Sequence, residues 1–182
     1  MKIFVIGGKA RAGKNTFGEY CKDHLKDYGY NPCVMRITEP LYGYAHNYFS
    51  WDEREITKPR EFLQKLGIEI IQKKMGKKDF LLNRLYEDIE ILENFFDVAI
   101  ITDVRLVNEF KALKKKYPDV VTIKVERENF VSDLTEEEKS HITETDLDNY
   151  HDFDYVVINR SLKDLSESAL EIVRDEVGYG EE

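Results

Sequence analysis

Apolar residues gather in five short runs along the chain, each rich in β-branched and aromatic side chains. Each run is almost continuously apolar, which is typical of strands covered on both faces rather than strands with one face in water. The chain is therefore expected to contain a sheet buried between two layers of helices. The predicted strands are residues 2–7, 33–37, 97–102, 120–125 and 154–159.

Between these runs, apolar residues recur at helical spacing. The pattern predicts amphipathic helices over residues 17–25, 62–70, 81–92 and 162–173. Ser161, with an acidic residue three positions later, marks the start of the last of these helices. Strands that alternate with helices imply right-handed crossovers and a mostly parallel sheet. The predicted fold class is thus α/β, a three-layer sandwich.

Two stretches interrupt this alternation. Residues 38–95 contain no strand pattern, and residues 126–153 are mainly polar. Long insertions beyond the ends of strands are where binding segments and lids usually lie. A length of 182 residues suits one domain with a sizeable core. We therefore predict a single domain over residues 1–182 that carries a helical insertion and a lid.

Charge and cysteine content limit the environment and the partners. The formal net charge of −9 disfavours bulk attraction to nucleic acid or to anionic lipid. An anionic ligand would therefore need a local cationic pocket. Cys21 and Cys33 have neither CxxC spacing nor a histidine nearby in sequence, which favours reduced intracellular thiols. No long apolar segment or signal-peptide pattern is present, so a cytoplasmic protein without membrane partners is expected.

The segment "GGKARAGKNT" follows the first predicted strand directly and leads into a helical pattern. It satisfies GxxxxGK, the pattern of a loop whose backbone N–H groups and following helix N-terminus hold phosphate oxygens. The lysine supplies a positive charge to the outer phosphates. The alternative, a glycine-rich turn that only joins strand to helix, explains the lysine less well. The predicted phosphate-binding residues are Gly8, Lys9, Ala10, Arg11, Ala12, Gly13, Lys14, Asn15 and Thr16.

The position after the lysine departs from the commonest form of this loop. A Ser or Thr usually stands there and contacts Mg²⁺, whereas Asn15 has that position here and Thr16 follows one residue later. This GK-x-T pattern resembles adenylate-kinase-like small-molecule kinases more than switch GTPases. We therefore expect Mg²⁺ to be held largely through water and the oxygens of the nucleotide.

A second polar cluster, "ITDVRLVNEF", ends the third predicted strand. Side chains at the carboxyl end of a parallel strand face the crevice in which ligands bind. Asp103 could orient a magnesium-bound water, and Arg105 could bind a phosphate in bidentate fashion. The structural alternative is that Asp103 caps a helix and that Arg105 forms a surface ion pair.

Together these motifs resemble the deoxynucleoside monophosphate kinases of tailed phages and related bacterial proteins, within the P-loop kinase superfamily. The loop is similar to G-x-K-R-S-G-K-D-T, and "DVRLVNE" matches D-x-R-x-x-N-E. The segments "KPREFLQKLGIEI", "SHITETDLDNY" and "DYVVINRSLKDL" resemble the family's middle, lid and last-strand segments. Asn15, Ile68 and Gln72 depart from the family's pattern, and the last two put the base preference in doubt.

The resemblance implies strand order 2-3-1-4-5, an acceptor-binding segment over residues 38–95 and a lid over residues 126–153. It implies an enzyme that uses ATP and Mg²⁺ to convert deoxynucleoside monophosphates to diphosphates. The resemblance assigns Lys14, Asp103 and Arg127 to catalysis, and residues 8–16 with Arg160 to ATP binding. It assigns Arg60, Gln64, Asp103 and Arg105 to the acceptor, and Arg36 is added as a further acceptor candidate. Thr16 and Asp103 are assigned to Mg²⁺ through water.

Several of these residues have structural alternatives. Arg36 and Arg54 suit surface ion pairs as well as phosphate contacts, and the positions of Arg127 and Arg160 rest only on their following a strand. His141 and Glu144 lie at helical spacing, but a lone pair is a poor zinc site, so ordinary lid structure is favoured. The aromatic residues of the insertion could stack on a base, although core packing is the favoured interpretation: Tyr42, Tyr44, Tyr48, Phe49 and Trp51.

Two other functions remain as alternatives. A P-loop kinase of a different phosphorylated small molecule, such as phosphomevalonate, would use a similar loop. A non-catalytic ATP-binding switch would also use one, although it would favour a hydroxyl directly after the lysine. The sequence leaves the oligomeric state open, with a homodimer as one option, and it favours small-molecule substrates over nucleic acid.

Overall fold

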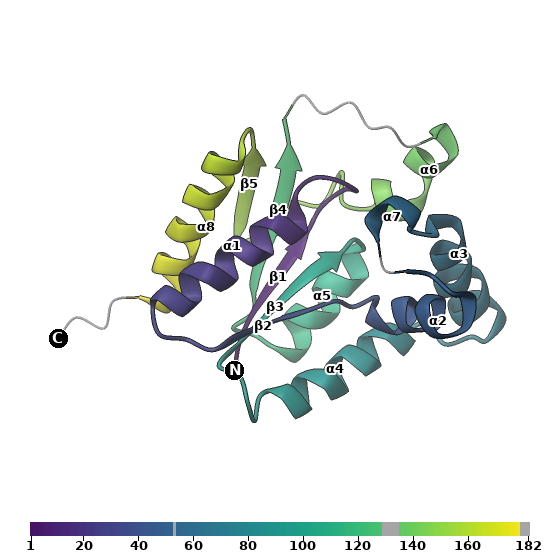
Figure 1. The fold of residues 1–182 in the computed structure, drawn as a ribbon, viewed down its shortest axis with the longest axis horizontal. Coiled ribbons are helices and arrows are strands. Elements are labelled where there is room, and N and C mark those ends of the chain that lie inside the picture. Colours follow the sequence, from purple (N-terminus) through teal and green to yellow (C-terminus); the bar gives the residue numbers. More distant parts are fainter. Residues whose placement is uncertain (53, 129–134, 179–182) are drawn as a thin grey trace. The chain divides into compact units, whose positions relative to one another are not determined.

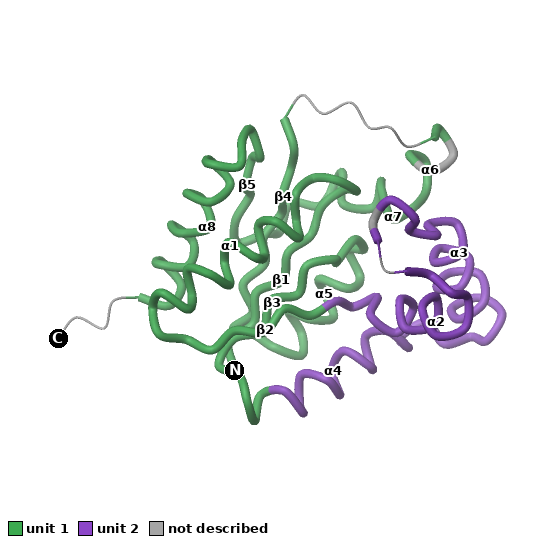
Figure 2. Tube along the Cα trace, viewed as in Figure 1, with its two compact units in different colours: residues 1–35, 93–182 green, residues 36–92 purple. Residues whose placement is uncertain are grey.

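The computed structural model describes residues 1–52, 54–128 and 135–178. The chain divides into two compact units, unit 1 with residues 1–35 and 93–182 and unit 2 with residues 36–92 (Figure 2). Part of the predicted lid, residues 129–134, lies outside the described residues. No helix among the described residues is long and apolar enough to cross a membrane.

Unit 1 is built on a five-stranded sheet with the order β2-β3-β1-β4-β5, in which every neighbouring pair is parallel (Figure 1). The predicted strands and the strand order 2-3-1-4-5 are confirmed. The α/β fold class with helices on both sides of the sheet is confirmed as well. The strands are β1 (Lys2–Gly7), β2 (Pro32–Met35), β3 (Val98–Val104), β4 (Val121–Arg127) and β5 (Tyr155–Asn159).

Only β1 has the predicted boundaries. The other four strands begin one residue away from the prediction, and β2, β3 and β4 also end two residues away from it. β2 ends at Met35, which pairs with Ile101, although the apolar run continues to Ile37. Ile37 is buried without belonging to a strand, and an apolar run reports burial rather than backbone conformation. β3 extends two residues beyond the predicted end at Thr102, through Asp103 to Val104.

One face of the sheet is covered by α1 (Lys14–Asp27) and α8 (Leu162–Val177), which pack against each other (Figure 1). Phe4 and Ile6 of β1 point to this face and join a fully apolar cluster with Phe17 and Cys21 of α1. Burying each such side chain stabilises the fold by about 1.5–3 kcal/mol. The hydroxyl of Ser161 accepts a hydrogen bond from the backbone N–H of Asp164 at 3.1 Å, which confirms the predicted start of α8.

The other face of the sheet carries α5 (Val107–Lys116). Gly7 marks this face, because a side chain there would collide with the ring of Phe110. Phe110 is fully buried and packs edge to face on Phe153, with ring centroids 5.1 Å apart. Within the segment between β4 and β5, two short helices are described, α6 (Glu136–Ser140) and α7 (Ile142–Thr145).

Unit 2 contains helices only within its described residues, as predicted for the insertion. Its core consists of Leu41, Ala45, Leu63 and Ile71. In the stretch Lys65–Lys74 the helix is wound more widely, and the backbone N–H of residue 75 binds the carbonyl oxygen five residues earlier. The elements are α2 (Glu39–Phe49), η1 (Glu55–Thr57), α3 (Arg60–Gln64), η2 (Lys65–Lys74) and α4 (Phe80–Leu92).

The aromatic residues of unit 2 follow the prediction only in part. Tyr42 and Trp51 pack against the small core, with ring centroids 5.4 Å apart. Tyr44, Tyr48 and Phe49 are exposed, by 38%, 74% and 63%, so the prediction that they are core residues is wrong. Helical period does not explain this exposure, because all three lie on the side of α2 that carries buried Leu41 and Ala45. Their rings instead contact other aromatic rings, Tyr44 with Tyr48 at 6.2 Å and Phe49 with Phe62 at 4.4 Å between centroids.

Candidate active site

The loop between β1 and α1 has the backbone conformation of an anion-binding nest. β1 ends at Gly7 and α1 begins at Lys14. Three intervening residues have positive φ: Gly8 (142°), Arg11 (59°) and Gly13 (106°). Such left-handed conformations turn successive N–H groups toward one point, and the N-terminus of α1 adds its positive end of the helix dipole.

Gly8 and Gly13 are required by their surroundings as well as by their φ angles. A Cβ on Gly8 would collide with the carbonyl oxygen of Val125 in β4. A Cβ on Gly13 would lie 2.5 Å from Nδ2 of Asn159. That same Nδ2 donates a hydrogen bond of 2.9 Å to the carbonyl oxygen of Ala12. The loop is therefore held against the ends of β4 and β5.

Lys14 is the loop lysine, and only 6% of its surface is exposed. Its Nζ donates a hydrogen bond of 2.6 Å to the carbonyl oxygen of Lys9, so the side chain lies back along the loop. Asn15 and Thr16, in the first turn of α1, are exposed. The first N–H groups of a helix have no partner within the helix, which leaves them to bind phosphate oxygens.

The end of β3 lies beside this loop, because Gly7 of β1 pairs with Val104 of β3. Asp103, one residue earlier, is therefore at the same carboxyl edge of the sheet. α5 begins at Val107 with Leu106 as its N-cap residue, so the alternative in which Asp103 caps that helix is wrong. Arg105 does form an ion pair, as the structural alternative expected, but its partner Glu144 is only 7% exposed, so the pair is not at the surface.

The turn after Asp103 is fixed by Glu109. Its Oε2 accepts hydrogen bonds from the backbone N–H groups of Arg105 and Leu106, both at 3.0 Å. Burial raises the pKa of Glu109 to about 7, although these two bonds act to lower it. The motif "DVRLVNE" thus includes its own carboxylate cap, which holds the backbone that carries Asp103 and Arg105.

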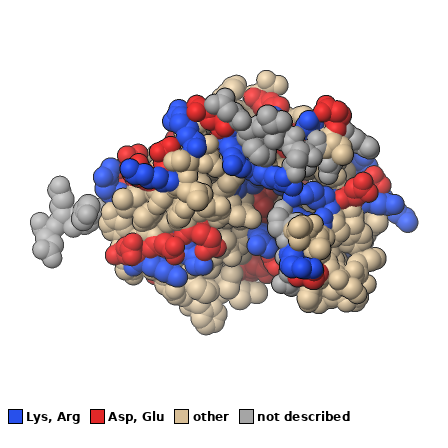
Figure 3. All heavy atoms as spheres, turned by 45° about the horizontal axis from the view of Figure 1, so that its top comes forward, with Lys and Arg blue, Asp and Glu red and all other residues tan. Residues whose placement is uncertain are grey.

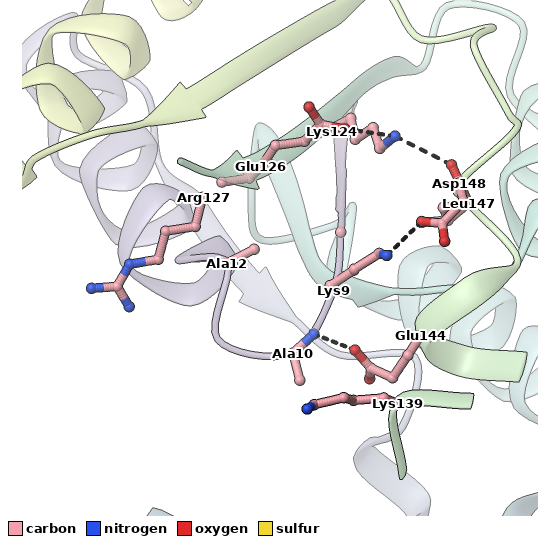
Figure 4. Close-up of a pocket in the computed structure, with 12 residues that line it drawn as sticks. Lys9, Ala10, Ala12, Lys124, Glu126, Arg127, Lys139, Glu144, Leu147 and Asp148 are labelled. Carbon is pink, nitrogen blue, oxygen red and sulfur yellow. Dashed lines mark hydrogen bonds and ion pairs between the residues drawn. The ribbon is translucent and has the colours of Figure 1, made fainter. Parts of the chain in front are cut away.

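A pocket of about 590 Å³ lies beside the loop, lined by the loop, β4 and the segment that contains α7 (Figure 4). Lys9 reaches across it to Asp148, with 2.7 Å between Nζ and Oδ1. Lys124 donates from Nζ to the carbonyl oxygen of Leu147 at 3.2 Å. The lining residues are Gly8, Lys9, Ala10, Ala12, Lys124, Val125, Glu126, Arg127, Lys139, Glu144, Leu147 and Asp148.

The two arginines predicted to follow strands have different surroundings. Arg127 is the last residue of β4 rather than the residue after it, whereas Arg160 does follow β5. Arg127 donates from Nη1 to the carbonyl oxygen of Arg11 at a long 3.5 Å, and its guanidinium points away from Lys9 and Lys124 (Figure 4). It is therefore beside the phosphate loop, as its predicted role requires. Arg160 is exposed and pairs with Glu128 at 3.3 Å.

The other acceptor candidates belong to unit 2. Arg36 pairs with Glu39 at 3.8 Å, and its Cζ lies 5.4 Å from the centre of the Tyr42 ring. Arg60 is the first residue of α3 and Gln64 the last. Since they are four positions apart, both point to the same side of that helix.

On the face that Figure 3 shows, Lys and Arg side chains are interspersed with Asp and Glu among the described residues. No group of three His, Cys, Asp or Glu side chains within the described ranges could hold a metal ion. The oxygen donors Thr16 and Asp103 suit a Mg²⁺ ion that keeps waters and takes its other ligands from a nucleotide.

Sequence reasoning missed Glu144 and Asn159 as residues that support the loop. Glu144 accepts a hydrogen bond from the backbone N–H of Ala10 at 2.8 Å, and Asn159 donates to Ala12. The sequence favours ordinary lid structure over a metal site for "HITETD", and His141 caps α7 by accepting from the N–H of Thr143. The signal for Glu144 was its position within the lid motif that resembles the kinase family.

Known proteins with this fold are distant in sequence. The structure of shikimate kinase from Bacteroides thetaiotaomicron is 15% identical, with a TM-score of 0.56, and the match covers 97% of this chain and 98% of that chain. The Mycobacterium tuberculosis APS kinase CysC Cys556Ala mutant is 11% identical, also with a TM-score of 0.56, and coverage of 95% and 98%. At these identities the likeness concerns the fold, that of P-loop kinases. None of the curated proteins matches the sequence.

A match to a protein-family model says more about function than these distant structures do. Residues 42–169 match the model described as "Deoxynucleotide monophosphate kinase". The matched stretch is more than half of the chain and includes the strand-end motif and the segment with Glu144, whereas the phosphate loop lies before it. The family resemblance of the motifs is therefore confirmed. The chain belongs to the deoxynucleotide monophosphate kinase family, and it is accordingly a phosphotransferase that acts on nucleoside monophosphates.

Proposed function

We propose that the chain transfers the γ-phosphoryl group of Mg²⁺-bound ATP to deoxynucleoside monophosphates at the carboxyl edge of its sheet. The observation that carries this proposal is the nest between β1 and α1, with the buried lysine Lys14 at its end. A nest of N–H groups with a lysine suits a chain of phosphates. The family adds a nucleoside monophosphate as the acceptor.

On the donor side, the loop of residues 8–16 binds the β- and γ-phosphates, and Lys14 leaves the Lys9 carbonyl to bridge phosphate oxygens. Arg127, next to Arg11 of the loop, binds the transferring group from the side of β4. An arginine in this role contributes roughly 10³–10⁵ in rate. Arg160 follows β5 and stacks on the adenine.

On the acceptor side, Arg105 binds the monophosphate, and Asp103 orients a water of the Mg²⁺ ion. Arg36, Arg60 and Gln64 of unit 2 contribute further contacts to the acceptor nucleotide. For Arg60 and Gln64 this assignment follows from their places in the family's motif, and for Arg36 it follows only from the ability of a guanidinium to bind phosphate.

In the reaction, an oxygen of the acceptor phosphate attacks the γ-phosphorus while the bond to the β–γ bridging oxygen breaks. ADP leaves with that electron pair. The acceptor phosphate is already ionised near pH 7, so no side chain has to remove a proton from it. Catalysis then depends on alignment and on positive charge near the equatorial oxygens. Mg²⁺, when bound, would supply part of that charge, and Thr16 and Asp103 would hold it through water.

The two alternatives are less favoured. An ATP-binding switch would not need a second cationic residue such as Arg105 beside the loop, and it would not fall in a kinase family. A kinase of another small phosphorylated molecule would share the loop, but the matched family acts on nucleotides.

An assay with several acceptors tests the proposal. Purified protein is incubated with Mg-ATP and, in turn, dAMP, dGMP, dCMP, dTMP and phosphomevalonate, while ADP release is followed. The proposal expects ADP release that rises with at least one deoxynucleoside monophosphate. Turnover with phosphomevalonate alone would support the other kinase. ATP binding without turnover for any acceptor would support the switch.

A further inference from the structure

Glu144 of α7 binds two separate parts of the catalytic edge at once. One carboxylate oxygen, Oε2, accepts the backbone N–H of Ala10 in the phosphate loop at 2.8 Å (Figure 4). The other, Oε1, accepts a hydrogen bond from Nη1 of Arg105, which follows β3. Glu144 is only 7% exposed. A carboxylate at this depth is stable because it has a charged partner and a backbone donor.

The segment around Glu144 is attached at several further points. Oδ2 of Asp146 accepts the N–H of Val107, the first residue of α5, at 2.7 Å. Leu147 is 5% exposed, and Asp148 forms the ion pair with Lys9. Residues 141–148 are therefore joined to the loop after β1, to the turn after β3 and to β4. Glu144 is the member of this segment that contacts both the loop and Arg105.

We propose that Glu144 is a positioning residue that fixes the guanidinium of Arg105 relative to the phosphate loop. This inference rests on the proposed role of Arg105 in binding the acceptor phosphate. Arginine has a long side chain that is costly to order, and one charged bond at Nη1 restricts it. The guanidinium has five N–H donors in total, so the pair with Glu144 leaves enough of them for bidentate contact with a phosphate.

The position of Glu144 matters because transfer is sensitive to alignment. The loop sets where the γ-phosphoryl group lies, and Arg105 sets where the acceptor phosphate lies. One carboxylate that holds both fixes the distance between donor and acceptor. A misplacement of about 1 Å can cost on the order of 10²-fold in rate.

A different role for Glu144 is that of an anion which occupies the loop until ATP displaces it. In that case removal of its charge would strengthen ATP binding. The positioning role instead predicts little change in ATP affinity. This holds because a glutamine at position 144 can still accept the N–H of Ala10, so the backbone of the phosphate loop keeps its support.

A double-mutant cycle on kcat tests the proposal, with Glu144→Gln, Arg105→Ala and the double variant. Glutamine can still accept the Ala10 N–H, but it has no charge with which to hold Arg105. We expect Glu144→Gln to lower kcat by on the order of 10²-fold with the Kd for ATP changed less than about threefold. In the Arg105→Ala background the same change is expected to lower kcat by less than about threefold, because the two effects are not additive.

Asp146→Asn is the matched control on the same segment. Asp146 also accepts a backbone N–H but is not the partner of Arg105 in the Glu144 pair. We expect its kcat to stay within about threefold of wild type, because a neutral amide oxygen still accepts that bond. Thermal unfolding of each variant confirms that it is folded. If Glu144→Gln is unstable, Glu144→Asp takes its place in the cycle, with a non-additive loss again expected.

Several results would overturn the inference. The first is a loss of kcat on Glu144→Gln that is equally large with Arg105 and with Arg105→Ala. The second is tighter ATP binding by Glu144→Gln. The third is a loss of kcat in Asp146→Asn as large as that in Glu144→Gln. Wild-type protein without turnover for any deoxynucleoside monophosphate would overturn the proposed function and this inference with it. Additive losses in an active enzyme overturn only the inference.

Discussion

The ammonium group of Lys14 donates a hydrogen bond to the carbonyl oxygen of Lys9, 2.6 Å away, so the loop lysine is bound to the start of its own loop. The side chain is buried, and its charge therefore lies within the nest rather than in solvent. Phosphate oxygens that enter the nest offer the ammonium a charged acceptor in place of the carbonyl. The ammonium group of Lys14 therefore already lies next to the place where the proposed mechanism puts the phosphate oxygens.

Replacement of Lys14 by alanine is expected to remove phosphoryl transfer while the fold is kept. The side chain contributes charge to the outer phosphates, and loss of one such group costs on the order of 10²–10³-fold in kcat. The loop backbone, held by Asn159 and Glu144, remains in place. The measurement is kcat with saturating Mg-ATP and the best acceptor, together with the circular dichroism spectrum.

Lys22→Ala is the control for this substitution. Lys22 lies two turns further along α1 and pairs with Glu19 at the surface. The Lys22→Ala variant should retain the kcat of the wild type. A Lys14→Ala variant with near-normal turnover would contradict the assignment of the loop.

A second prediction concerns Gly8→Ala. Gly8 has a φ of 142°, and an added Cβ would meet the carbonyl oxygen of Val125. Alanine therefore suffers both backbone strain, on the order of 1–3 kcal/mol, and a clash with a backbone atom that cannot move aside cheaply. We expect a lower melting temperature and at least about tenfold weaker ATP binding, since the nest is distorted.

Gly29→Ala separates the two causes. Gly29 also has a positive φ, 83°, but apart from Gly29 and its two chain neighbours no residue has an atom within 4 Å of the position of the added Cβ. Its variant should show the strain alone, as a smaller loss of stability, with ATP affinity unchanged. Equal effects of both substitutions on ATP binding, measured by isothermal titration calorimetry, would argue against a loop shaped by contact with β4.

The contrast between the predictable and unpredictable features has a physical cause. The strands and the loop were accessible because hydrophobic runs and the GxxxxGK spacing are local properties of the sequence. Glu144 and Asn159 were not, because their contacts with Ala10 and Ala12 join residues 134 and 147 positions apart. Composition carries no signal for which of many carboxylates or amides will make such a contact.

The first and last residues of "DVRLVNE" also differ in how far they could be predicted from the sequence. Asp103 at the strand end followed from the topology of parallel sheets. The contact of Glu109 with the backbone of Arg105 and Leu106 required the start of α5, which lies three residues later than a helix capped by Asp103 would begin. Local motifs thus located the catalytic edge, whereas its supporting contacts appeared only in the folded chain.

Arg105→Lys is expected to weaken acceptor binding more than ATP binding. Lysine retains the charge but cannot form the bidentate bonds of a guanidinium. It would also lose the geometry of the pair with Glu144. We expect the KM for the acceptor to rise about tenfold, which corresponds to about 1.4 kcal/mol. The KM for ATP should change less than about twofold, because the loop is untouched.

Arg174→Lys, near the end of α8, is the matched control, since Arg174 is half exposed and pairs only loosely with Asp175 at 3.8 Å. Both KM values should match those of wild type. An equal rise in the two KM values for Arg105→Lys, or no rise in either, would remove Arg105 from the acceptor site.

The raised pKa of Glu109 predicts that the stability of the folded protein depends on pH. Burial raises its pKa from 4.5 to about 7, so the folded protein keeps a proton on Glu109 at pH values where the unfolded chain has released it. Between these two values the folded state binds more protons, and its stability falls as the pH rises. Below pH 4.5 and above pH 7 this contribution no longer changes.

Glu109→Gln should remove that dependence. A neutral amide oxygen can still accept the N–H groups of Arg105 and Leu106, without the cost of ionising a partly buried carboxyl. From pH 5 to pH 8 we expect wild type to lose on the order of 2–3 kcal/mol of unfolding free energy relative to the variant, since each unit of pKa shift corresponds to about 1.4 kcal/mol. Urea denaturation at a series of pH values measures this difference. The exposed Glu171 on α8 provides the control, because Glu171→Gln should leave the slope of wild type unchanged. If Glu109→Gln has that slope too, the carboxyl is ionised in the folded protein throughout the range, and its hydrogen bonds to the turn outweigh its burial.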